Sequence, residues 1–172
     1  MGFIIYLFGP SAAGKSTTAD ILKNSINNLD VIDFDIIKRQ IPHYDWERHA
    51  YEGQMMTLDK LKLDVITEDK ILLLMPSSKN KDEYELIRSI AREQNRRLIN
   101  IHITAPNEIL IERYKERLLH IDPSKKDWKF KTLDEFITKI QEPYFVPDNA
   151  ETFDSSTTTV EDIARRIIEL TE

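Results

Sequence analysis

Five short apolar runs, separated by stretches with the period of amphipathic helices, organise this chain. The clearest runs are Phe3–Phe8, Lys70–Met75 and Leu98–Ile103, whereas Val31–Phe34 and Glu151–Asp154 are assigned mainly by their positions between helical stretches. Alternation of strands and helices is typical of a parallel sheet covered by helices on both faces. The pattern therefore predicts an α/β fold in three layers.

The helical stretches begin at recognisable residues. Thr132 and Thr158 are each followed three residues later by glutamate, the capping-box pattern in which two side chains bond free amides at a helix start. Pro106 stands where a first helical residue needs no amide hydrogen. The predicted helices are Lys15–Asn28, Asp45–Thr67, Asp82–Asn95, Pro106–His120, Thr132–Gln141 and Thr158–Thr171.

Nothing along the chain marks a boundary between domains, because there is no internal repeat, low-complexity tract or shift in composition. A length of 172 residues with 41% hydrophobic content suits one domain, 1–172. Within it we expect an acceptor-binding insertion at about 36–67. A polar, proline-containing stretch joins two helices at about 118–131 and is predicted to be a lid.

Composition narrows the class of protein. The chain has no cysteine, which excludes disulfides and thiolate metal sites and fits a cytoplasmic setting. A net charge of −6 argues against nucleic acid as a partner, although a local basic groove would still bind one. The apolar run Phe3–Phe8 is too short to cross a membrane.

The loop after the first strand carries the strongest chemical signal. Its sequence GPSAAGKS, residues 9–16, matches G-x-x-x-x-G-K-[ST] between a strand and a helix. The glycines permit loop torsions that point successive amides at phosphate oxygens, the lysine would reach the β- and γ-phosphates, and the serine hydroxyl suits Mg²⁺. A glycine-rich turn without a ligand is the alternative. The predicted nucleotide-binding residues here are Gly9, Ser11, Ala12, Ala13, Gly14, Lys15, Ser16 and Thr17, with Lys15 also catalytic and Ser16 also a metal ligand.

Asp33 and Asp35 follow the second strand, at the sheet edge where ligands of doubly wound folds bind. Spaced two apart on an extended segment, their carboxylates would share one face. One hypothesis is that Asp35 accepts the proton of the attacking hydroxyl while Asp33 supports Mg²⁺. The alternative is that the pair caps the turn and a short helical segment after it.

The residues after this pair are candidates for recognition of the acceptor. Lys38 and Arg39 would clamp an anionic group, or else are solvated surface charges. Tyr44 and Trp46 would stack on a ring and hydrogen-bond it, or else form an aromatic patch that covers a helix start.

Arg113 and Arg117 lie four residues apart and therefore on one face of the helix before the lid. Guanidinium groups stack on bases and stabilise transferring phosphoryl oxygens, and Arg117 is the candidate for the second role. An ordinary charged helix face is the alternative.

These segments together resemble the small P-loop kinase superfamily, which includes nucleoside monophosphate, shikimate, gluconate and polynucleotide 5′-kinases. The resemblance rests on FGPSAAGKST, IDFD, TAPNEILIERYKER and FDSSTTTVEDIARRI. It implies a five-stranded parallel sheet in the order 2-3-1-4-5, Arg113 stacked on adenine, Arg117 at phosphate, and the turn containing Ser155 near adenine. The third strand departs from the family pattern, because it ends LLLMPSS without the expected aspartate.

The sequence thus predicts a kinase that uses ATP and Mg²⁺ to phosphorylate a hydroxyl of a small molecule, such as a nucleoside or sugar, as a monomer or homodimer. Two alternatives remain open at this point. One is a nucleoside monophosphate or polynucleotide 5′-hydroxyl kinase, and the other is a nucleotide-binding regulatory NTPase that has no acceptor.

Overall fold

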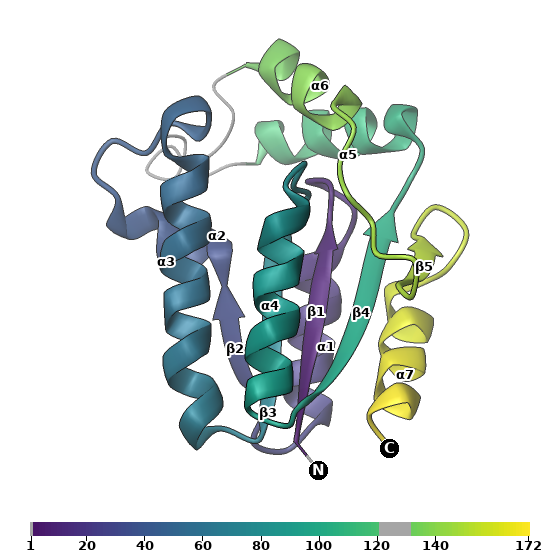
Figure 1. Ribbon diagram of the computed structural model, residues 1–172. Helices are drawn as coiled ribbons and strands as arrows, with labels where there is room; N and C mark the ends of the chain where they lie inside the picture. Colours follow the sequence, from purple (N-terminus) through teal and green to yellow (C-terminus); the bar gives the residue numbers. More distant parts are fainter. Residues whose placement is uncertain (1, 121–131) are drawn as a thin grey trace.

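A single parallel sheet forms the centre of the computed structural model, which describes residues 2–120 and 132–172 (Figure 1). Neighbouring strands pair in parallel in the order β2-β3-β1-β4-β5, which confirms the predicted fold class and strand order. Residues 121–131 of the predicted lid lie outside the described residues. The strands are β1 Phe3–Gly9, β2 Asp30–Asp33, β3 Lys70–Pro76, β4 Arg97–Thr104 and β5 Glu151–Asp154.

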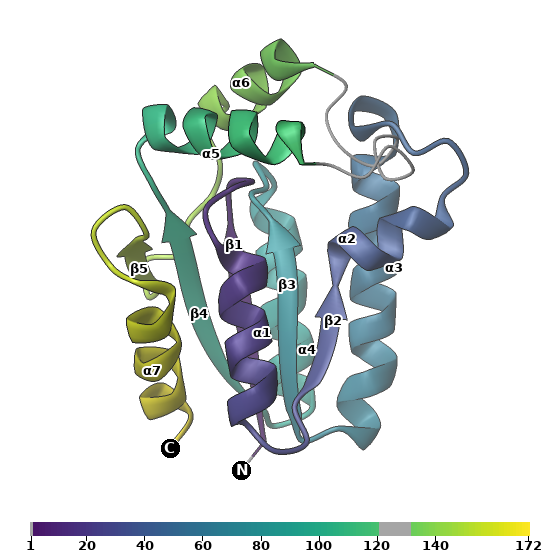
Figure 2. The same cartoon turned by 180° about the vertical axis from the view of Figure 1, so that it is seen from behind.

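Helices cover both faces of the sheet and the carboxyl ends of its strands (Figures 1 and 2). On one face lie α3 (Trp46–Thr67) and α4 (Lys81–Glu93), and on the other lie α1 (Lys15–Ser25) and α7 (Val160–Thr171). Above the strand ends lie α5 (Asn107–Leu119) and α6 (Leu133–Gln141). Within the described ranges, no helix has the length and apolar character needed to cross a bilayer.

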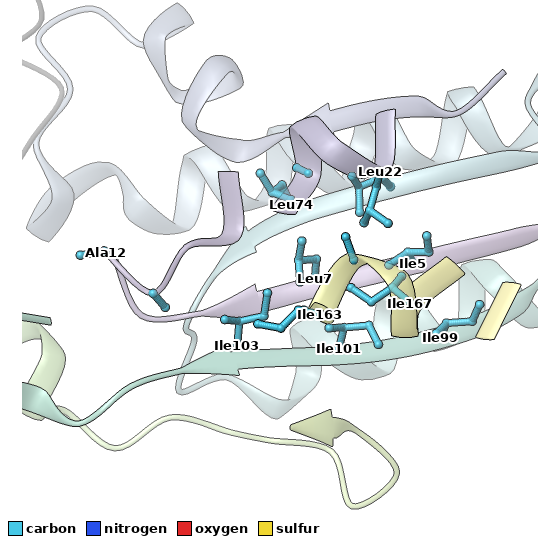
Figure 3. Close-up of a cluster of buried hydrophobic side chains, with 14 of the residues drawn as sticks. Ile5, Leu7, Ala12, Leu22, Leu74, Ile99, Ile101, Ile103, Ile163 and Ile167 are labelled. Atoms are coloured by element: carbon cyan, nitrogen blue, oxygen red, sulfur yellow. The ribbon is translucent and has the colours of Figure 1, made fainter. Parts of the chain in front are cut away.

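The central strand β1 is buried along its whole length because both of its faces are covered. Ile5 and Leu7 point toward α1 and α7, where they pack with Leu22, Ile163 and Ile167 (Figure 3). The alternate residues of β1, Ile4, Tyr6 and Phe8, pack toward α3 and α4 instead. This burial fixes the strand whose end carries the glycine-rich loop.

Helix ends differ from the prediction where capping geometry decides them. The capping box of Thr132 and Glu135 is present, as predicted. The second predicted box is wrong by one residue, because Thr159 rather than Thr158 caps α7, through the amide of Asp162. Pro106 is the N-cap of α5 and not its first helical residue.

A short helix follows β2, as only the alternative interpretation of Asp33 and Asp35 held. Strand β2 ends at Asp33, and the chain at once forms α2 (Phe34–Ile37) followed by a 3-10 turn, η1 (Lys38–Gln40). The apolar run Val31–Phe34 therefore divides between a strand and a helix. The side chain of Asp33 accepts a hydrogen bond from the Asp35 amide at 2.7 Å and caps α2, which ends the strand.

One contact holds α6 against α5, and a second holds the segment after α6 to the sheet. Phe136 is fully buried and its ring stacks on Tyr114 of α5, with centroids 3.9 Å apart. Beyond α6, the hydroxyl of Tyr144 lies 2.8 Å from Nε2 of His102 in β4. Burial, aided by the charge of Lys15, lowers the pKa of His102 to about 4, so this buried ring is neutral at physiological pH. The segment that leads from α6 to β5 is thus held to the sheet.

The stacked pair gives a stability test. Replacing the fully buried Phe136 with alanine leaves a cavity beside Tyr114 and is expected to lower the free energy of unfolding by about 3–5 kcal/mol. Urea unfolding measures the loss. The matched control is Phe153→Ala in β5, whose side chain is only partly buried and should cost clearly less. Equal losses would contradict the role given to this stack.

Candidate functional site

The loop between β1 and α1 has the backbone conformation of a phosphate cradle. Gly9 has φ 144°, Gly14 has φ 99°, and Ala12 takes the left-handed region with φ 66°. A Cβ at Gly9 would collide with the carbonyl oxygen of Ile103 in β4, so that position requires glycine. A side chain other than glycine held at positive φ, as Ala12 is, marks a loop whose shape is fixed by its surroundings.

Lys15 is folded back onto this loop. Its ammonium donates hydrogen bonds to the carbonyl oxygens of Gly9 at 2.7 Å and Pro10 at 2.8 Å. Burial lowers the pKa of Lys15 to about 8, opposed in part by the charge of Asp35 and reinforced by that of Arg117. A polyphosphate chain in the loop would offer this cation stronger acceptors than two neutral carbonyls.

A cavity of about 170 Å³ opens beside the loop, at the carboxyl ends of the strands. The loop and the start of α1 form one wall. The rest is formed by β2 with α2, the end of β3, the first half of α3, the C-terminal half of α5, and α6. It is where an open α/β sheet binds its ligands. The predicted site residues that line it are Ser11, Ala12, Ala13, Gly14, Lys15, Ser16, Thr17, Asp33, Asp35, Tyr44, Trp46 and Arg117.

The aspartate pair reaches the cavity by a different route from the one predicted. The two carboxylates do not share the face of an extended segment, because Asp33 ends β2 and Asp35 is in α2. Asp33 caps α2, as the alternative interpretation held, and also lines the cavity. Burial and the neighbouring charge of Asp35 raise the pKa of Asp33.

The two arginines of α5 contact different parts of the site. Arg113 donates hydrogen bonds to the Ala12 carbonyl at 3.3 Å and to the hydroxyl and carbonyl of Ser155, each at 2.8 Å. It therefore ties the loop to the turn after β5, and neither Arg113 nor Ser155 is among the residues that line the cavity. Arg117 does line it, and its charge acts on Lys15.

The acceptor candidates separate into two groups. Tyr44 is buried and Trp46 is partly buried, and both line the cavity, but Arg39 is exposed in η1 and is not a lining residue. Lys38, the neighbour of Arg39, lines the cavity instead. Sequence reasoning missed several lining residues because no motif marks them and only the packing of α3, α6 and β3 brings them here. They are Gln54, Ser77, Glu135 and Lys139.

The oxygen donors suit a magnesium ion. Mg²⁺ prefers hard oxygen ligands and keeps several waters, so it needs few groups from the protein. Ser16 and Asp33 both line the cavity, and the serine hydroxyl and the aspartate carboxylate are such oxygens. Among the described residues, no cluster of three or more His, Cys, Asp or Glu could hold a metal by itself.

Sheet order and loop together define a P-loop protein, with the loop at the end of the central strand and a cavity beside it. The chain belongs to a family whose model is described as an AAA domain, which matches residues 5–126. Its structural neighbours include a gluconokinase and an APS kinase, which agrees with the predicted resemblance to the small P-loop kinase superfamily.

Named relatives give further comparisons. A Pyrococcus abyssi protein named "Probable adenylyl-sulfate kinase" is 28% identical over 118 residues, and the match covers 65% of each chain. A solved structure from Chloroflexus aurantiacus has a TM-score of 0.72 at 17% identity, covering 99% of this chain and 96% of that one. The APS kinase of Mycobacterium tuberculosis, solved with AMPPNP and APS, has a TM-score of 0.66 at 19% identity, covering 99% and 97%. At such identities the two structures show a shared fold.

The lysine of the loop gives a pH signature. With its pKa lowered to about 8, Lys15 is largely neutral at pH 9, and contact with phosphate would favour its charged form. Binding of ATP is therefore expected to take up about one proton at pH 9 and much less at pH 7, and affinity should fall as pH rises above about 8. Calorimetry in two buffers of different ionisation enthalpy measures the uptake.

The control for this measurement is Lys15→Met, which cannot take up the proton. In that variant the difference between pH 9 and pH 7 should vanish. Equal proton uptake by the two proteins at pH 9 would show that Lys15 does not contact the nucleotide.

Proposed function

We propose that this protein is an ATP-dependent kinase that transfers the γ-phosphoryl group to a hydroxyl of a small-molecule acceptor. The observation that carries the proposal is the convergence of the loop lysine and a second group of polar side chains on one cavity. Lys15, Asp35 and Arg117 come from three separate elements and all line it. Phosphoryl transfer requires mainly such positioning and positive charge.

The nucleotide end of the cavity is the glycine-rich loop. Amides of Ser11 to Ser16 and the first turn of α1 would bind the β- and γ-phosphates, since a helix N-terminus and a loop of this shape both favour anions. Thr17 lines the cavity one residue further on. Lys15 would leave the carbonyls of Gly9 and Pro10 for the phosphate oxygens. Adenine would lie toward Arg113 and Ser155, on the other side of the loop.

The acceptor end is the pocket between α2 and the start of α3. The acceptor hydroxyl oxygen forms a bond to the γ-phosphorus while the bond from that phosphorus to the bridging oxygen of ADP breaks. Asp35 takes the proton that the hydroxyl loses. Arg117 stabilises charge on the transferring oxygens, where a fixed cation contributes most. When bound, Mg²⁺ would supply further positive charge, held by Ser16 and Asp33.

Aromatic side chains give this end of the cavity its character. Tyr44 and Trp46 offer flat apolar surfaces, and Gln54 offers an amide, so the pocket suits a ring that carries hydroxyl groups. One protein similar to this chain is named a probable adenylyl-sulfate kinase and another a gluconokinase, so adenylyl sulfate and gluconate are compounds to test. Both belong in the first panel of candidate acceptors.

The test is release of ADP from ATP and Mg²⁺ over a panel containing adenylyl sulfate, gluconate, shikimate, nucleosides, nucleoside monophosphates and 5′-hydroxyl oligonucleotides. A kinase is expected to release ADP faster with one class of acceptor. The product should be heavier than the acceptor by about 80 Da, because a phosphoryl group replaces a proton. Uniformly slow release, indifferent to every acceptor, would favour a regulatory NTPase instead.

The base is tested by Asp35→Asn. Loss of the proton acceptor is expected to lower kcat for the acceptor reaction by about 10²–10⁴-fold while ATP binding is retained. Asp45→Asn is the matched control, because Asp45 lines the same cavity but mainly caps α3 through the amides of Glu47 and Arg48. An Asp35→Asn enzyme with full turnover would reject the base assignment.

A further inference from the structure

Asp35 has a cationic partner inside the cavity wall. The ammonium of Lys38 pairs with the Oδ1 atom of Asp35, three residues earlier and one helical turn away. The Lys38 side chain is only 12% exposed, whereas that of Asp35 is 47% exposed. The lysine is therefore the more buried partner of the pair, and both residues line the cavity.

Two aromatic rings fix the position of this lysine. Its Nζ lies 5.4 Å from the ring centroid of Phe34 and 5.4 Å from that of Tyr44, and both rings are buried. A cation held over two ring faces is restrained in direction as well as attracted. Asp35 is thus held from two sides, by the Asp33 cap on its backbone amide and by Lys38 on its side chain.

The packing of α3 makes room for this arrangement. Gly53 lies against α2, and a Cβ there would come 3.0 Å from Cε2 of Phe34 and 3.5 Å from Cβ of Lys38. A Cβ there would crowd the Phe34 ring, while its contact with the Lys38 stem would be an ordinary van der Waals contact. Arg39, by contrast, projects from η1 outside the cavity lining. Of these two adjacent basic residues, only Lys38 lines the cavity.

We infer that Lys38 is a positioning residue for the proposed reaction: it orients the Asp35 carboxylate toward the acceptor hydroxyl. This role rests on the proposed kinase function and adds a residue to it. Lys38 acts through Asp35, and the proton of the acceptor hydroxyl still goes to Asp35.

A double-mutant cycle tests the inference with the acceptor identified by the panel. Lys38→Met keeps the length of the side chain and removes its charge, and it is expected to lower kcat by about 10²-fold, the scale of a misplaced catalytic group. The KM for ATP should not change. In an Asp35→Asn background the same substitution should cost less than about twofold, because residues that act as a unit are not additive. Lys38→Arg should recover most of the activity.

Two further variants complete the cycle. Lys62→Met is the matched control, because Lys62 also pairs with an aspartate three residues away, Asp59, but lies on the exposed face of α3 outside the cavity. It should behave as wild type. Lys38→Gln is a second neutral variant that should reproduce Lys38→Met, and retained binding of an ATP analogue shows that either protein is folded.

Several results would overturn this role. One is a loss from Lys38→Met that is equally large in the presence and absence of Asp35. Another is a raised KM for the acceptor with unchanged kcat, which would make Lys38 a binding contact. If the wild type is active and Lys38→Met has full activity, the role of Lys38 is rejected while the proposed kinase function stands. A wild type inactive with every acceptor would overturn the proposed function and this role together.

Discussion

The site depends on how closely the end of β1 approaches β4. Gly9 has no side chain, so the chain can pass directly against the carbonyl of Ile103 and turn with a positive φ. The Gly9 carbonyl then accepts hydrogen bonds from the Ser77 amide at 3.1 Å and from the Lys15 ammonium at 2.7 Å. One peptide group thereby joins the central strand, the end of β3 and Lys15. A side chain at this position would collide with the Ile103 carbonyl and push the end of β1 away from β4.

Fixed walls surround this loop. Arg113 ties the loop to the turn after β5, and the stack of Phe136 on Tyr114 holds α6 above it. On the opposite side, α2 begins directly after β2, so Asp33 at the strand end and Asp35 in the helix both line the cavity. Rigid elements of this kind can hold catalytic groups at the geometry that phosphoryl transfer requires.

Strong local signals made the fold and the loop predictable. Apolar runs located the strands, and the motif at residues 9–16 located the phosphate cradle, because both are set by neighbouring residues along the chain. The acceptor side of the cavity was harder to predict from the sequence. Sequence spacing placed Asp33 and Asp35 on one extended face, but the capping bond of Asp33 starts a helix there. Packing between helices that are distant in sequence determines that Lys38 rather than Arg39 lines the cavity. The same packing brings Lys139 there.

The most direct test of the central claim is a crystal structure with Mg²⁺ and a non-hydrolysable ATP analogue. The account predicts the β- and γ-phosphates within the loop of residues 9–16, with the Lys15 ammonium moved from the carbonyls of Gly9 and Pro10 to phosphate oxygens. If the analogue lay elsewhere, or if Lys15 kept both carbonyl contacts beside a bound nucleotide, the assignment of this loop as the phosphate site would be contradicted.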